Sequence, residues 1–119
     1  MNPEARLSEL AALKPGWFAG AGAAISAQTI ATARAVLVEL AACGVPTPGV
    51  YPTPRGGVQC EWLDRDRVAG EVEALEGRVE AWVHLEPVEF GKPDETWEMA
   101  GEDVAAIVRE FAVVAGWPR

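Results

Sequence analysis

The side chains best suited to chemistry are one histidine and several glutamates that recur at alternate positions. His84 is the only histidine, with Glu80 and Glu86 near it and Glu73 close by if two neighbouring segments pair as strands. A histidine among carboxylates is a donor set that divalent metal ions accept. However, a single histidine on a solvated strand is far more often a surface residue than a ligand. We therefore predict neither a metal site nor a cofactor.

Covalent catalysis would require a nucleophile, a base and a group that orients the base. The only serines, Ser8 and Ser26, both fit structural positions in helices, and Cys60 is expected to face away from His84. Carboxylate pairs for acid–base chemistry can be drawn from the glutamates, but none has an identifiable apolar pocket that would raise its pKa. We therefore predict that the protein is not an enzyme.

The elements that position these residues are strands with a period of two. Alternation of apolar and polar residues marks half-buried antiparallel strands at residues 58–63, 68–75 and 79–85, and residues 95–100 can add a short last strand. The pattern places Trp62 on the inner face, and Trp82 and His84 on the outer face. Prolines in two Pro-Thr-Pro triplets remove ladder donors, so any strand at residues 49–53 must lie at an edge.

Three helices are expected around this sheet. Asn2 and Ser26 suit the N-caps of helices at about residues 3–13 and 27–43, and Asp103 precedes a closing helix. In the main helix we expect a buried stripe of Ile30, Ala33, Leu37, Leu40 and Ala41, opposite a wetter face of Gln28, Thr32, Ala35 and Glu39. Because exposed aromatic rings are costly, Trp17 and Phe18 are expected to hold the intervening glycine-rich loop against the core.

Together these elements predict one α+β domain over residues 1–119. Its helices would pack on one face of a four- to five-stranded antiparallel meander, in the order α-α-β-β-β-β-α. A chain of 119 residues, 50% hydrophobic and 24% charged, suits one globular domain. No signal peptide or membrane-spanning run is recognisable, so we expect a cytoplasmic protein whose Cys43 and Cys60 stay reduced.

The net charge excludes some classes of partner. The chain has 18 acidic and 10 basic residues, which gives a formal charge of −8. Such a protein does not bind nucleic acid by neutralising phosphates, nor does it dock on an anionic membrane. Imitation of DNA toward a DNA-binding partner remains open.

Residues 17–62 resemble a group of small bacterial and phage proteins with no established activity. The shared features are a Gly-Trp loop, a Ser-capped helix and the string Pro-Thr-Pro-x-Gly-Gly-Val-Gln-x-Glu-Trp, here Pro52 to Trp62. The resemblance covers less than half of the chain. It implies a similar compact fold, and it implies no activity, ligand or site residue.

The feature most suggestive of function is the outer face of the sheet. Its predicted members are Glu61, Glu71, Glu73, Glu80, Trp82 and His84. Because neighbouring like charges destabilise a sheet, acids gathered around a tryptophan indicate a surface that a partner covers. We predict a small acidic protein-binding protein with a basic protein partner: an adaptor, an antitoxin or immunity protein, or a phage anti-defence inhibitor. The alternatives are a merely solvated face, a structural homo-oligomer such as a dimer built on the Trp82 face, and a small carboxylate–histidine enzyme.

Overall fold

The elements of the protein follow the order α-α-β-β-β-β-β-α. The computed structural model describes residues 2–64, 67–85, 90–93 and 95–118, without the side chains of residues 64 and 67–69. The helices are α1 (Pro3–Ala11), α2 (Ala27–Ala42) and α3 (Val104–Ala115). The strands are β1 (Gly49–Pro52), β2 (Val58–Asp64), β3 (Arg67–Leu75), β4 (Arg78–Leu85) and β5 (Glu95–Gly101).

The five strands form one antiparallel meander in the order β1-β2-β3-β4-β5. The predicted α+β class is therefore confirmed, and β5 is the fifth strand that the sequence left open. The short strand with prolines, β1, lies at an edge as predicted. The inward orientation expected for Val68 lies outside the described side chains.

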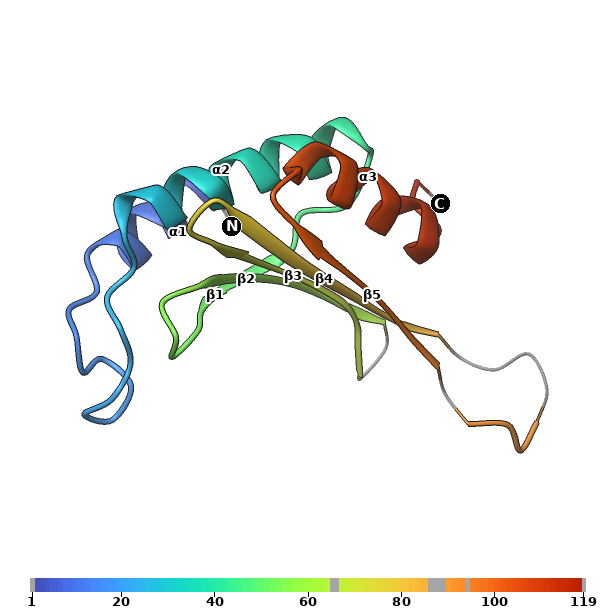
Figure 1. Ribbon diagram of the computed structural model, residues 1–119, viewed down its shortest axis with the longest axis horizontal. Helices are drawn as coiled ribbons and strands as arrows, with labels where there is room; N and C mark the ends of the chain where they lie inside the picture. The colour runs from blue at the N-terminus through green and yellow to red at the C-terminus, as the bar shows by residue number, and fades with distance from the viewer. Residues whose placement is uncertain (1, 65–66, 86–89, 94, 119) are drawn as a thin grey trace.

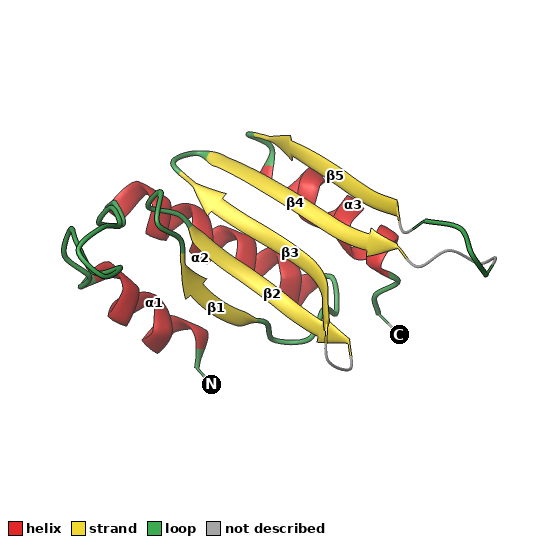
Figure 2. Cartoon of the chain, turned by 90° about the horizontal axis from the view of Figure 1, so that it is seen from below, coloured by secondary structure: helices red, strands yellow, loops and turns green. Residues whose placement is uncertain are grey.

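The helices α2 and α3 cover one face of the sheet, and α1 lies beside β1 (Figure 1). In the view from below, the second face of the sheet has no described helix in front of it (Figure 2). This arrangement makes two layers, helix on sheet. The outer residues of each strand therefore belong to a surface that the described chain leaves uncovered.

The core between the layers is centred on aromatic rings. The ring of Trp62 lies 5.1 Å from that of Phe111 and 5.6 Å from that of Trp117, measured between centroids. The indole N–H of Trp62 donates a hydrogen bond of 2.7 Å to the carbonyl of Pro46. Trp62 is only 6% exposed, so its predicted place in the core is confirmed, and with it the inward register of β2.

The buried face of α2 differs from the predicted stripe. Ile30, Ala33 and Leu40 are buried, but Thr32 is buried as well and Ala41 is exposed. The expectations for Thr32 and Ala41 were therefore wrong. Thr32 is buried because it contacts the β3–β4 turn: the Gly77 N–H donates to the Thr32 hydroxyl at 3.2 Å, while that hydroxyl donates to the Gln28 carbonyl at 3.0 Å.

The loop between α1 and α2 closes on itself instead of on the core. Phe18 is 55% exposed, and its ring meets the ring of Trp17 edge-on at 5.7 Å. Phe18 and Ala21 exchange two backbone hydrogen bonds of 2.7 and 2.8 Å, and the indole N–H of Trp17 donates to the Ala23 carbonyl. The expectation that both aromatics hold this loop against the core was therefore wrong, and in Figure 1 the loop projects from the molecule.

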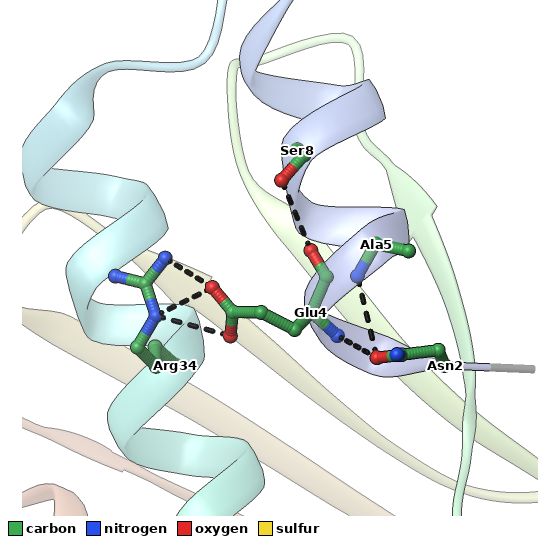
Figure 3. A network of polar contacts seen from close by, with 5 residues as sticks. All are labelled: Asn2, Glu4, Ala5, Ser8 and Arg34. Carbon is green, nitrogen blue, oxygen red and sulfur yellow. Dashed lines mark hydrogen bonds and ion pairs between the residues drawn. The ribbon is translucent and has the colours of Figure 1, made fainter.

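Polar contacts fix α1 to its neighbours. The Asn2 side chain caps α1, and the Glu4 carboxylate accepts hydrogen bonds of 3.0 and 2.6 Å from Nε and Nη2 of Arg34 on α2 (Figure 3). Hydrogen bonding to Arg34 lowers the pKa of Glu4 below its ordinary value. On the other side, Nε of Arg6 donates to the Val50 carbonyl in β1 at 2.9 Å. This contact occupies a backbone acceptor on an edge strand, which opposes pairing with another chain.

Candidate binding surface

The six residues predicted on the outer face all belong to that face in the observed register. Glu61 pairs with Glu71, Glu71 with Trp82, and Glu73 with Glu80, while His84 lies further along the strand of Glu80 and Trp82. Because side chains alternate between the two sides of a strand, directly paired residues share a face. The structure thus brings the predicted residues together on the uncovered side, in two groups with different surroundings.

The first group is an ion-pair cluster around Arg55. This side chain lies in the β1–β2 turn and reaches across the sheet, where Nη2 contacts Oε1 of Glu73 at 2.5 Å and also contacts the carboxylate of Glu80. Nε adds a bond of 3.1 Å to Glu73. These hydrogen bonds, first to Glu73 and then to Glu80, raise the pKa of Arg55 above its ordinary value. Arg55 therefore engages both acids of this group and compensates one of their two negative charges within the chain.

Glu73 is held further by the turn itself. Its side chain is only 5% exposed, and its Oε2 accepts a hydrogen bond of 2.7 Å from the Thr53 hydroxyl. That hydroxyl in turn accepts the Gly57 N–H at 2.9 Å. A methyl group on Gly57 would stand 2.2 Å from Oε2 of Glu73, so glycine is what lets this carboxylate lie against the turn. Glu73 is therefore part of a structural cluster and not of an exposed surface.

The second group surrounds Trp82 and retains its negative charge. Trp82 pairs with Glu71 on β3 and with Glu98 on β5, so its indole lies between two carboxylates of the same face. Glu61 extends this row on β2. Within the described part of the chain, no arginine, lysine or histidine forms an ion pair with Glu61, Glu71 or Glu98. These acids are available to a positively charged partner.

A shallow hollow lies beside this tryptophan. Its volume is about 270 Å³, and its lining includes Trp82, Glu80, Glu98 and Met99 from the two strands β4 and β5. Sequence reasoning missed Glu98 because residues 95–100 were too weakly patterned to place on a face. Glu98 lies two residues from both Thr96 and Ala100, which are polar or small. This spacing was the signal that could have placed Glu98 on the outer face.

Cys60 and His84, the candidate nucleophile and base, do not converge. Cys60 is fully buried on the helix side, whereas His84 is exposed on the other face. Burial raises the pKa of the Cys60 thiol to about 12, which makes it a poor nucleophile at neutral pH. Glu86, which the sequence placed near His84, lies outside the described residues. Among those that are described, no three histidine, cysteine or acidic side chains are grouped to hold a metal ion.

Comparison with known proteins supplies no relative for this chain. No family model, curated protein or solved structure matches it. The resemblance suggested by residues Pro52 to Trp62 therefore stays an expectation. Separately, no helix in the described parts of the chain is long and apolar enough to cross a bilayer.

Proposed function

We propose that the protein is a non-enzymatic, cytoplasmic binding protein that holds a basic protein partner on its uncovered sheet face. The contact would be centred on Trp82, with Glu61, Glu71, Glu98 and His84 around it. An adaptor, an antitoxin or immunity protein and a phage anti-defence inhibitor all share this mode of action. Glu73 and Glu80, paired with Arg55, would support the surface instead of contacting the partner.

The observation that carries the proposal is the position of Trp82. It is half-buried beside an open hollow, on a face that no described helix covers, between the register partners Glu71 and Glu98. Tryptophan contributes a large contact area at a small cost in conformational entropy, and it is enriched among residues that dominate binding energy. A tryptophan set among carboxylates suits a partner that offers a basic side chain next to an apolar one.

The charge distribution supports a basic partner in a second way. The Arg55 cluster leaves the acids near Trp82 without a described counterion, and the whole chain carries a formal charge of −8. Opposite charge on the partner would speed encounter, because electrostatic attraction raises association rates more than it raises affinity. The same charge opposes direct contact with nucleic acid.

Affinity capture followed by titration tests this proposal. The partner retained by the parent chain from the source cells is identified, purified and titrated against the parent and against Trp82→Ala. We expect Trp82→Ala to weaken binding by about 2 kcal/mol or more while the fold stays intact. Equal affinity of the two proteins would remove Trp82 from the binding surface and contradict the proposal.

Self-assembly is the second candidate, and strand β5 is the observation that favours it. The edge at β1 is blocked by the contact of Arg6 with Val50 and by Pro52, which has no N–H. At the other edge, β5 is seven residues long and largely exposed. A stable dimer at low micromolar concentration, measured by sedimentation, would favour this candidate over a separate partner.

A further inference from the structure

A second concave site lies at the opposite edge of the sheet from the Trp82 hollow. It is an open groove of about 630 Å³ where β1 begins, bounded by the α2–β1 connection, the end of β2 and the chain after α3. The side chains that give it chemical character are Tyr51, Glu61, Trp62 and Trp117. Nothing in the proposed contact around Trp82 uses this groove, apart from Glu61 at its rim.

The aromatic side of the groove is fixed in place by the core. Trp62 is anchored through its N–H to the Pro46 carbonyl, and its ring lies 5.6 Å from that of Trp117. Tyr51 leans over Gly49, where an added methyl group would stand 2.8 Å from its ring. Glycine at that position therefore allows the tyrosine ring to lie along the groove. The site is largely formed before any ligand binds.

Among the described residues that line the groove, the charge has one sign. Glu61 is the only charged residue of that described lining, which includes no lysine or arginine. One oxygen of Glu61 accepts a hydrogen bond of 3.2 Å from the Gln59 amide, and no described residue donates to the other oxygen. Glu61 shares this lining with the exposed ring of Tyr51 and the half-buried ring of Trp117, whereas Trp62 is nearly buried behind them. A carboxylate together with accessible aromatic rings is a combination that attracts a cation with a flat apolar surface.

We propose that this groove receives an arginine side chain of a protein partner. The guanidinium is planar, weakly hydrated and able to stack on aromatic rings while it donates hydrogen bonds to a carboxylate, which an ammonium group does less well. The groove is open, whereas sites for free small molecules enclose most of their ligand; the arginine is therefore carried by a chain. Only this last point, the source of the arginine, rests on the function proposed above.

A capped tripeptide, acetyl-Gly-Arg-Gly-amide, is a direct probe. Titration into the full chain is followed by NMR on the indole N–H signals of Trp62, Trp117 and Trp82. We expect saturable shifts at Trp62 and Trp117 with a dissociation constant on the order of 1 mM, and no shift at Trp82. The same peptide with citrulline, which is neutral and nearly isosteric, should bind at least about tenfold more weakly.

Two variants of the same chemistry separate the groove from general attraction to an acidic protein. Glu61→Gln should weaken the arginine peptide at least about fivefold. Glu71→Gln, which removes the same charge from the paired residue outside the groove, should leave binding within about twofold. Absence of saturable shifts, equal binding of the citrulline peptide, or equal effects of the two variants would overturn the inference.

The outcome is distinguishable from that of the proposed function. Trp82→Ala should leave the tripeptide titration unchanged while it weakens the captured partner. If the tripeptide fails to bind but Trp82→Ala still weakens the partner, the groove is not an arginine site and the Trp82 surface stands. If the tripeptide binds as expected and Trp82→Ala has no effect on the partner, the groove is an arginine site and the proposed role of the Trp82 surface is wrong.

Discussion

Glu73 lies on the uncovered face of the sheet and yet is almost fully buried. Its carboxylate is surrounded by donors from one turn, which supplies Arg55 and the Thr53 hydroxyl. Burying a carboxylate is costly unless it is paired and hydrogen-bonded, and here both conditions are met. Glu73 and Glu80, which the sequence analysis predicted as partner-binding residues, thus hold the β1–β2 turn on strands β3 and β4.

Removal of Arg55 should therefore destabilise the protein. Arg55→Met leaves Glu73 buried without its cation, and we expect the free energy of unfolding to fall by about 1–3 kcal/mol, with the half-exposed position of Arg55 favouring the lower end. Urea denaturation measures this change. Arg34→Met is the matched control, because its pair with Glu4 is exposed on both sides and should contribute less. Equal losses in the two variants would contradict the structural role of the cluster.

Cys60 offers a test of burial through its ionisation. Its folded pKa is raised by burial to about 12, against an ordinary value of 9.0. Above pH 9 the unfolded chain loses this proton while the folded chain keeps it, so the unfolded state binds fewer protons and stability falls as pH rises toward 12.

The measurement is the slope of unfolding free energy against pH in that window for the parent and for Cys60→Ala. The variant lacks the ionising group, so its slope should be less negative even though its stability is lower throughout. In addition, a thiol reagent applied to the folded parent should modify the half-buried Cys43 and spare Cys60. Parallel slopes, or equal reactivity of the two thiols, would show that Cys60 is not buried in solution.

The elements themselves were predictable to the extent that local chemistry fixes them. Capping residues predicted the first two helices, and an acidic residue at the start predicted the third. In the structure Asn2, Ser26 and Asp103 each accept a backbone N–H of the first turn. The alternation of apolar and polar residues, with a period of two, predicted β2, β3 and β4. What local chemistry could not show were contacts between distant segments, such as the Gly77 turn that buries Thr32, and the bulge after Trp62 that skips one residue of β3.

The candidate site, like the fold, could be predicted from the sequence only in part. Alternation placed Trp82, His84 and four glutamates on one face because side-chain direction follows the strand. It could not pair Arg55 with Glu73, since they are 18 residues apart and meet only through a turn that Gly57 permits. It also could not identify Trp117 as a neighbour of Trp62, because that contact depends on how α3 packs.

The cap of α2 gives a prediction at the scale of the element. The Ser26 hydroxyl accepts the Thr29 N–H at 3.1 Å, so Ser26→Ala should lower stability by about 1 kcal/mol. Ser8→Ala is the same substitution within α1, where Ser8 bonds back to the Glu4 carbonyl and alanine is the better helix former. Thermal denaturation should therefore show a lower midpoint for Ser26→Ala alone. Similar midpoints for the two variants would mean that the cap contributes nothing.

At the scale of the whole molecule, the helix layer and the sheet layer have different roles. The helices close one face of the sheet and, through Arg6, one of its edges, while the other face is left open with an acidic surface around Trp82. The Arg55 cluster and the aromatic core hold the strands that present this surface. Under the function proposed above, this acidic surface would bind a basic protein, whose opposite charge would speed encounter.

The most direct test of this account is the affinity of the captured partner for three proteins: the parent, Trp82→Ala and Phe18→Ala. Phe18 is the matched control, since it is an exposed aromatic residue on the projecting α1–α2 loop. The account predicts that Trp82→Ala weakens binding by about 2 kcal/mol or more, roughly 30-fold, while Phe18→Ala leaves it unchanged. Unchanged affinity for Trp82→Ala, or a loss confined to Phe18→Ala, would contradict it and move the binding surface to the loop.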